Sequence, residues 1–208
     1  MQANRMRSRR KDSSTPTVTE AARRAQIVEA AITTIAEDGY PQASFARIAK
    51  RAGLSSTGLI SYHFAGKQDL TTAIAGTIVA DLSAFMTTWM RDRATSPHAA
   101  LVAYIEGLTG YMQTQGSRMR VLSSIFLHGG FAWSDEDQQR AQGGIADVLR
   151  WGQETGDFRP FDIEVMATTI QRSLDGIPFL QLAQPDLDLT QYAAELVAIF
   201  TRATAADS

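Results

Sequence analysis

Apolar residues recur every three or four positions along most of the chain, which is the spacing of one buried helical face. The first stripe, between Thr17 and Gly39, contains Ile27, Val28, Ala31, Ile32, Ile35 and Ala36. A second runs from Lys67 to about residue 91, and further helices are expected over residues 97–115, 118–128, 135–155, 162–182 and 188–205. Strand-like alternation is nearly absent. The pattern therefore predicts an all-α fold.

Residues 44–70 begin with a short helix that ends in a tight turn. Ser44 can cap this helix through its hydroxyl, and its buried face is expected to contain Phe45, Ile48, Ala49 and Ala52. Gly53 ends the helix, because glycine adopts the positive φ of a helix stop without steric cost. A second helix is expected directly after this turn.

The second helix should present a small polar surface. Ser55 or Ser56 is expected to cap it, and it ends near Tyr62 and His63. Its inward anchors are predicted to be Leu59, Ile60 and Phe64, and its outward positions Ser56, Thr57, Ser61 and Tyr62. Such a helix fits a DNA major groove, so the two helices predict a helix-turn-helix. An ordinary helical hairpin has the same spacing, but the turn glycine and the polar second helix favour DNA binding.

The run IAKRAGLSSTGLISYHFAGKQDL at residues 48–70 resembles the DNA-binding domain of TetR-type (tetracycline-repressor family) transcriptional regulators. The resemblance covers about residues 19–75. It implies an N-terminal three-helix helix-turn-helix domain, followed by a helical ligand-binding and dimerisation domain. The stretch from Gly53 to Phe64 is one residue longer than the common pattern of the family. Which of Ser55, Ser56 and Thr57 contacts bases therefore stays open.

The resemblance also implies how this chain would hold double-stranded DNA. Residues 56–62 would enter the major groove, while phosphates would be held by Ser44, Arg47, Tyr62, His63 and Lys67. The full set of candidate DNA contacts is Ser44, Arg47, Ser55, Ser56, Thr57, Gly58, Ser61, Tyr62, His63 and Lys67. Lys67 opens the long helix, where its ammonium and the free helix N–H groups would together attract a phosphate.

Charge is distributed unevenly along the chain, although the net charge is only −2. Residues 1–70 hold eleven Lys and Arg against six Asp and Glu, whereas residues 71–208 hold nine against sixteen. A positive end and a negative body would turn the first part toward phosphate. Residues 1–16 are basic and lack apolar periodicity, so they are interpreted as a disordered arm that either tracks DNA or is simply solvated.

The composition excludes several other classes of protein. The 208 residues include no cysteine, so disulfides, thiolate metal sites and cysteine nucleophiles are excluded. No run of 18 apolar residues occurs and the N-terminus is polar, which favours a cytoplasmic protein without a membrane partner. No phosphate loop, nucleophile elbow or zinc-binding helix is found, so no enzyme, metal or cofactor is expected. A helical adaptor that binds protein rather than DNA is the alternative.

The second part of the chain is where a small-molecule effector is expected. Aromatic residues concentrate there, and Gly107 and Gly110 suggest the close approach of a helix or a ligand. The candidate ligand contacts are Trp89, Tyr104, Tyr111, Phe126, His128, Trp151 and Asp175. Each of the aromatic residues can equally be a core residue, and His128 can be a helix-end cap. The negative balance of this part, with Glu106 and Asp175, favours an apolar or amphipathic effector that is neutral or cationic.

The last two helices are the candidate dimer interface. By resemblance they would form a four-helix contact with a second subunit, and a dimer multiplies the few base contacts of one helix-turn-helix. The expected interface residues are Ile170, Leu174, Ile177, Leu189, Tyr192, Leu196 and Phe200. Packing inside one subunit would produce the same stripe. We therefore expect an arm (1–16), a helix-turn-helix domain (17–66) and a ligand-binding and dimerisation domain (67–208). The expected function is that of a homodimeric, ligand-responsive regulator. The family resemblance implies that it is a repressor that binds a pseudo-palindromic operator.

Overall fold

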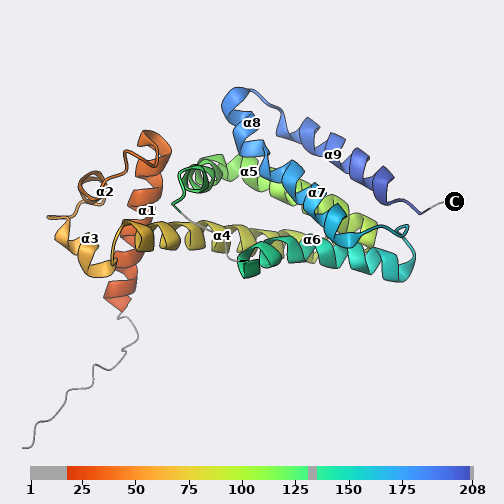
Figure 1. Cartoon of the computed structure of the whole chain (residues 1–208), viewed down its shortest axis with the longest axis horizontal. Helices are drawn as coiled ribbons and strands as arrows, with labels where there is room; N and C mark the ends of the chain where they lie inside the picture. The colour runs from red at the N-terminus through yellow and green to blue at the C-terminus, as the bar shows by residue number, and fades with distance from the viewer. Residues whose placement is uncertain (1–17, 131–134, 207–208) are drawn as a thin grey trace, which may run out of the picture.

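The computed structural model describes residues 18–130 and 135–206, with only the backbone of 135–142, and within these ranges the chain is helical (Figure 1). The predicted arm at residues 1–16 lies outside the described residues. The helices in chain order are α1 (Val18–Asp38), α2 (Phe45–Arg51), α3 (Gly58–His63), α4 (Lys67–Arg91), α5 (Pro97–Leu127), α6 (Asp135–Thr155), α7 (Ile163–Asp175), α8 (Ile177–Ala183) and α9 (Leu189–Thr204). In the described ranges the strand-like pairing is one isolated bridge between Phe158 and Ala205. The predicted all-α fold is confirmed.

The first helices end where glycine permits a positive φ. Gly39 follows α1 with φ +84° and Gly53 follows α2 with φ +65°. The hydroxyl of Ser44 caps α2 by accepting the N–H of Arg47 at 3.3 Å. These features confirm the sequence interpretation of the first helix of the hairpin and of its turn.

Two details of the second helix were predicted wrongly. Neither Ser55 nor Ser56 is its N-cap, because α3 begins at Gly58 and its cap residue Thr57 makes no side-chain capping bond. Leu59 was expected to face inward, but 38% of it is exposed. A helix of six residues has room for few inward positions, and Ile60 occupies the buried one.

Helix α5 combines two of the predicted helices into one bent element. It begins after Ser96, whose hydroxyl accepts the N–H of Ala99 at 3.2 Å. At Gln115 the backbone leaves the helical region, with φ −117° and ψ 27°. The pair Gly116-Ser117 follows directly, which is a known cause of kinks. The break expected between residues 115 and 118 is therefore present as a kink. The predicted helix over 162–182 is divided instead into α7 and α8 at Gly176.

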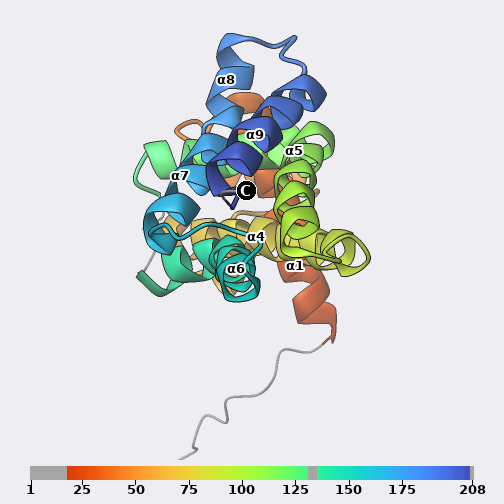
Figure 2. The ribbon, with the colours of Figure 1, turned by 90° about the vertical axis from the view of Figure 1, so that its right-hand side faces the viewer.

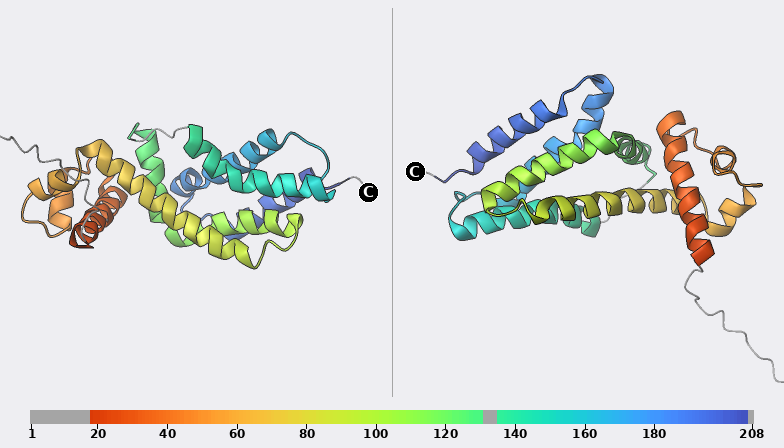
Figure 3. Two further views of the ribbon diagram at one scale, coloured as in Figure 1. Left: turned by 90° about the horizontal axis from the view of Figure 1, so that it is seen from below. Right: turned by 180° about the vertical axis from the view of Figure 1, so that it is seen from behind.

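The molecule has two apolar cores, and the long helices α4 and α5 contribute to both (Figures 1 and 3). The first core joins α1, α2 and α3 to the beginning of α4 and to Val121, Leu122 and Ile125 near the end of α5. The second core gathers α6, α7, α8 and α9 around the beginning of α5, as seen along the long axis in Figure 2. The division predicted after residue 66 stays a prediction, since the first core continues into α4.

Helix α4 also has the length and composition of a membrane span, alone among the described helices. Its apolar side chains, however, have partners within the fold. Leu70, Ile74 and Ile78 are buried in the first core, while Leu82 and Met86 pack against the second. The apolar character of α4 is accounted for by these two contacts.

Candidate nucleic-acid interface and effector region

Helix α3 is held against α1 by apolar and polar contacts at its C-terminal end. Ile60 and Phe64 are fully buried in the first core. Arg24 of α1 donates from Nη1 to the carbonyl oxygen of His63 at 2.7 Å. The same guanidinium lies 4.1 Å from the centre of the Phe64 ring. The Arg24 side chain thus hydrogen-bonds a carbonyl oxygen at the C-terminal end of α3 and packs on the ring of Phe64.

Two further contacts fix the hairpin to α1. Gln26 donates from Nε2 to the carbonyl oxygen of Ala52 at 2.8 Å, which holds the end of α2. The hydroxyl of Tyr62 donates to Oε1 of Glu20 at 3.3 Å. Sequence reasoning missed Arg24 and Gln26. The sequence does not distinguish these two polar residues of α1 from a solvated helix surface.

The candidate DNA contacts gather at one end of the molecule, on α2, α3 and the turns beside them (Figure 1, left). Most of them are exposed: Ser44, Arg47, Ser55, Ser56, Thr57, Gly58, Ser61, Tyr62 and Lys67. Tyr62 has 72% of its surface free, whereas His63 is half-buried beneath it with the two rings edge to face. The exposed side of α3 is therefore small and polar apart from Leu59 and Tyr62.

The basic candidates already have partners in the free protein. Arg47 pairs with Asp38 at 2.8 Å, and the Nζ of Lys67 lies 3.3 Å from the carbonyl oxygen of Tyr40 and 4.4 Å from its ring centre. Asp69 accepts the N–H of Ala65 at 2.9 Å at the start of α4. To contact a phosphate, Arg47 and Lys67 would have to exchange these contacts, which would lower the net gain of each new contact.

The candidate effector residues are distributed over several parts of the fold. Tyr104 and Asp175 are joined through Gln171, which accepts from the Tyr104 hydroxyl at 2.8 Å and donates to Asp175 at 2.8 Å. Burial raises the pKa of Asp175, an effect that Gln171 and Arg172 oppose. Burial, reinforced by the charge of Asp175, also raises the pKa of Tyr104. This group is a satisfied network at the edge of the second core, where the Asp175 side chain is partly exposed.

The remaining candidates do not share a cavity within the described residues. Phe126 packs against the first core rather than the second. His128 is exposed at the C-cap of α5, where its Nδ1 lies 2.7 Å from the carbonyl oxygen of Ser124. Trp151 is 36% exposed on α6, and Trp89 donates to the carbonyl oxygen of Ala103 at 2.9 Å. The structure therefore places these candidates in different parts of the fold, because aromatic content does not reveal which core a residue enters, and their role in binding an effector stays a prediction.

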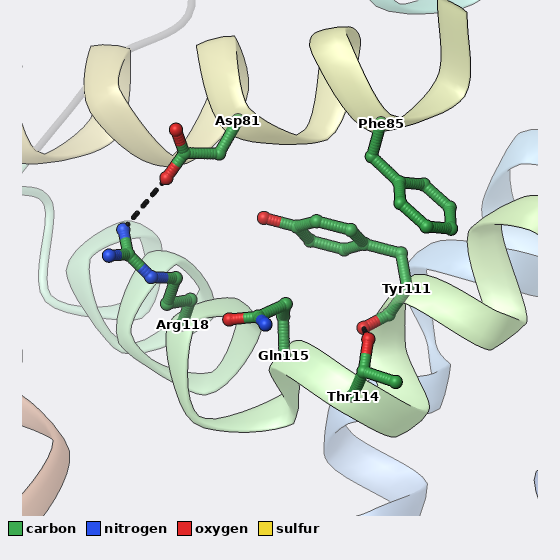
Figure 4. Close-up of a pocket in the computed structure, with 6 residues that line it drawn as sticks. All are labelled: Asp81, Phe85, Tyr111, Thr114, Gln115 and Arg118. Carbon is green, nitrogen blue, oxygen red and sulfur yellow. Dashed lines mark hydrogen bonds and ion pairs between the residues drawn. The ribbon is translucent and has the colours of Figure 1, made fainter. Parts of the chain in front are cut away.

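A pocket of about 310 Å³ lies between α4 and α5, and Tyr111 is the one predicted effector residue that lines it (Figure 4). Its other lining residues are Asp81, Phe85, Thr114, Gln115 and Arg118. The kink at Gln115 lies in its wall. Sequence reasoning missed these residues. One available signal was Asp81, the single charged residue of α4 between Asp69 and Arg91.

Arg118 links this pocket to the helix-turn-helix. Its Nη1 donates to Oδ2 of Asp81 on α4 at 2.9 Å, and its Nη2 donates to Oε2 of Glu29 on α1 at 2.7 Å. The arginine side chain is 20% exposed, and the two carboxylates are about half exposed. A second bond joins the start of α4 to the segment after α5, from Gln68 Nε2 to the carbonyl oxygen of Gly130 at 2.8 Å.

The residues predicted for the dimer interface are occupied inside the subunit. Six of them are buried in the second core, namely Ile170, Leu174, Ile177, Leu189, Leu196 and Phe200, while Tyr192 is half-buried against it. The apolar stripe of α9 packs on α5 of its own chain. The structure thus gives these side chains partners within one subunit, and their role in a dimer stays a prediction. The large apolar side chains that α7, α8 and α9 do expose are Val165, Phe179, Leu182 and Ile199.

The hairpin anchored on α1, with a polar second helix at the tip, defines the chain as a helix-turn-helix protein. Residues 27–74 match the family model of bacterial regulatory proteins, tetR family. Residues 27–74 thus form a helix-turn-helix domain of the tetR family. The predicted family resemblance is confirmed.

Curated relatives support the assignment over part of the chain. The transcriptional regulator BetI of Stenotrophomonas maltophilia is 35% identical over 102 residues, which is 49% of this chain and 52% of that protein. BetI 1 of Chromohalobacter salexigens is 38% identical over 41% of this chain and 42% of its own length. The chain thus matches about half of the length of these relatives. All are named as transcriptional regulators, a class that is generally not enzymatic.

Solved structures extend the similarity of fold to nearly the whole chain. The fatty acid degradation regulator FadR from Bacillus halodurans superposes with a TM-score of 0.76 over 86% of this chain and 94% of its own, at 22% identity. A tetR-family regulatory protein from Rhodococcus gives a TM-score of 0.73 over 89% and 98%, at 21% identity. At such identities the comparison establishes the architecture, a helix-turn-helix on a helical body.

Proposed function

We propose that this chain is a cytoplasmic, dimeric transcriptional repressor that binds a pseudo-palindromic operator and releases it when a small molecule binds. The observation that carries the proposal is the exposed face of α3, held on α1 by Arg24 and by the buried anchors Ile60 and Phe64. A short helix fixed in this way can enter a major groove without rearrangement. Its outward Ser61 and Tyr62 can then meet base edges and phosphates.

A second copy of the chain is proposed as the partner in DNA binding. One α3 helix reaches few base pairs, so two of them related by two-fold symmetry would supply the affinity that one lacks. The apolar side chains exposed on the C-terminal helices, Val165, Phe179, Leu182 and Ile199, would be covered by this contact. The buried stripe of α9 would support the interface from behind rather than form it.

The proposed route from effector to DNA runs through the two long helices. Each of them enters both cores, so a change in the angle between α4 and α5 must also move α1 and α3. The pocket lies between these two helices, and Arg118 joins its wall to α1. A ligand shifts the equilibrium only if it binds the DNA-free arrangement more tightly, and such coupling is reciprocal.

DNA binding can be tested with duplexes selected from a random pool, by fluorescence anisotropy at several salt concentrations. Replacing Lys67 by alanine should weaken binding similarly on selected and scrambled duplexes. It should also reduce the slope of log K against log salt by about 2 for a dimer, at roughly 0.9 per phosphate contact. Replacing Ser61 by alanine should alter the preferred sequence instead.

The matched control removes one positive charge from the opposite end of the molecule. Arg202 on α9 is exposed and far from α3, so Arg202→Ala should leave both affinity and salt slope unchanged. Equal effects of Lys67→Ala and Arg202→Ala would mean that the overall charge, rather than this end of the chain, governs binding. A chain that binds no selected duplex would disprove the proposal and leave the protein-binding adaptor.

A further inference from the structure

The hydroxyl of Tyr111 is a buried polar group without a hydrogen-bond partner among the described residues. Its side chain is almost entirely buried, with a residue exposure of 3%. The hydroxyl points into the pocket between α4 and α5, toward the pair formed by Asp81 and Arg118 (Figure 4). Buried hydroxyls are nearly always satisfied, because leaving one unpaired is costly. An unpaired hydroxyl at a pocket wall therefore indicates a polar group on the occupant.

The charges around this hydroxyl favour an occupant that donates hydrogen bonds. Arg118 is shared between Asp81 and Glu29, so the three groups carry one net negative charge. The pKa of Tyr111 is raised mainly by burial and further by Asp81, whereas Arg118 lowers it by a smaller amount. The net negative charge of the three groups beside the phenol favours a cationic occupant.

Asp81 also has capacity to accept a further bond. Its Oδ2 receives the bond from Arg118, while in the described part of the chain its Oδ1 receives none. Each carboxylate oxygen can accept two hydrogen bonds. The side chain is half exposed, so this oxygen is accessible to an occupant. Figure 4 shows the Tyr111 oxygen and the Asp81 carboxylate on the same side of the pocket, so an ammonium group placed there would have both as acceptors.

The wall beside these polar groups is aromatic. The ring of Phe85 lies 5.4 Å from that of Tyr111 and 5.9 Å from that of Trp89, nearly parallel to the latter at 17°. Aromatic faces attract cations and pack against apolar groups. A volume of about 310 Å³ is at the small end of ligand pockets, which run from roughly 300 to 1,000 Å³. The occupant is therefore a small molecule.

We propose that the pocket between α4 and α5 binds a small amine in its ammonium form, with Asp81 and Tyr111 as its polar contacts and Phe85 beside its aromatic or apolar body. The assignment of this amine as the effector rests on the proposed function. An ammonium on Oδ1 of Asp81 shares that carboxylate with Arg118 and so weakens the attraction between the carboxylate and the guanidinium, which is also bound to Glu29 of α1. The occupant thereby changes a contact that ties α5 to α4 and α1.

Binding is tested by isothermal titration calorimetry on the full chain without DNA, with 2-phenylethylamine as the probe. The neutral 2-phenylethanol and the anionic 3-phenylpropionate serve as matched ligands. The amine should bind at least about tenfold more tightly than either, since hydrogen bonds to a charged group are the stronger ones. Equal or tighter binding of the alcohol or the carboxylate would overturn the proposal, as would no binding of the amine up to about 10 mM.

Two variants with matched controls locate the site. Asp81→Asn should weaken amine binding about tenfold or more, and Tyr111→Phe, which keeps the ring, about threefold. The control Asp147→Asn removes a carboxylate paired with Arg150 on α6, and Tyr192→Phe removes a hydroxyl from α9. Both controls should bind the amine like the unaltered chain. Amine affinity that is unchanged in both pocket variants would place the site elsewhere and refute the assignment.

A separate measurement of DNA binding, with and without the amine, tests whether the bound amine acts as an effector. If the chain binds its selected duplex and the amine binds the pocket, the amine should weaken DNA binding in the unaltered chain and much less in Asp81→Asn. Amine binding with no effect on DNA affinity would refute the role as effector while leaving the site in place. Failure of DNA binding itself would refute the proposed function, and the calorimetry on the free chain would still decide the site.

Discussion

Alanine at Gly107 and alanine at Gly110, one turn apart on α5, should change stability in opposite directions. A Cβ on Gly107 would lie 2.6 Å from Cδ1 and 2.9 Å from Nε1 of Trp89, and 3.0 Å from the sulfur of Met86. The indole cannot withdraw freely, because its Nε1 donates to the carbonyl oxygen of Ala103 at 2.9 Å. Its ring is also stacked on Phe85. Gly107→Ala must therefore displace a fixed side chain.

The magnitude follows from three effects. Overpacking a filled site costs about 1–3 kcal/mol. Losing the bond from Trp89 costs about 0.5–1.5 kcal/mol more. Alanine returns roughly 1 kcal/mol through its higher helix propensity. The free energy of unfolding of Gly107→Ala should thus fall by about 0.5–3.5 kcal/mol.

Gly110 is the matched position, since a Cβ there would meet nothing within 4 Å. Only the helix propensity remains, so Gly110→Ala should raise the free energy of unfolding by about 0.5–1 kcal/mol. Urea denaturation followed by far-UV circular dichroism measures both values, and in a chain of this size each kcal/mol moves the melting temperature by about 2–4 °C. A stabilising Gly107→Ala, or two changes of the same sign, would show that Trp89 does not pack against α5 at Gly107.

Two further predictions concern the C-terminal helices. Ile199→Glu, at a side chain that is 54% exposed, should give folded monomers in sedimentation. Leu196→Ala should instead lower the free energy of unfolding by about 2–5 kcal/mol, because Leu196 is buried. An Ile199→Glu chain that stays dimeric at low concentration would show that α9 is not part of the interface. Burial raises the pKa of Asp175 in the folded chain, so ionising this carboxylate costs more free energy in the folded chain than in the unfolded one. The contribution of Asp175 to the free energy of unfolding is therefore largest at acid pH, where it is protonated, and is lost as pH rises through the folded pKa. Asp175→Asn should therefore stabilise the chain more at pH 7 than at acid pH in urea titrations, and an equal effect at both would contradict the raised pKa.

The helices and the hairpin could be predicted because their signals are local. Gly39 and Gly53 mark helix ends through a backbone preference that no distant contact has to supply. Ser44 caps α2 for the same reason. Local signals do not decide between neighbouring residues that can all cap a helix. The sequence therefore favours Ser55 or Ser56 as the N-cap of α3, whereas the structure has Thr57.

The sites depended on contacts between distant segments, which periodicity does not encode. The stripe of α9 with Leu196 and Phe200 predicts a buried face but does not say whether α5 or a second subunit covers it. The pocket combines Asp81 with Arg118, two residues 37 positions apart that meet only because α5 bends at Gln115. Of the two spaced glycines, Gly107 does mark a close approach, whereas Gly110 does not.

The bend in α5 explains why one helix can serve both cores. Before Gln115, residues such as Leu101 and Ile105 pack in the second core; after it, Val121 and Ile125 pack in the first. A straight helix would carry its buried face past one of these cores, because the face of a rigid helix continues in one direction. The kink redirects the second half toward α1 and leaves the space that Tyr111 and Arg118 line. The bend that lets α5 enter both cores therefore also forms a wall of the pocket. An occupant of the pocket contacts the helix that connects the two cores.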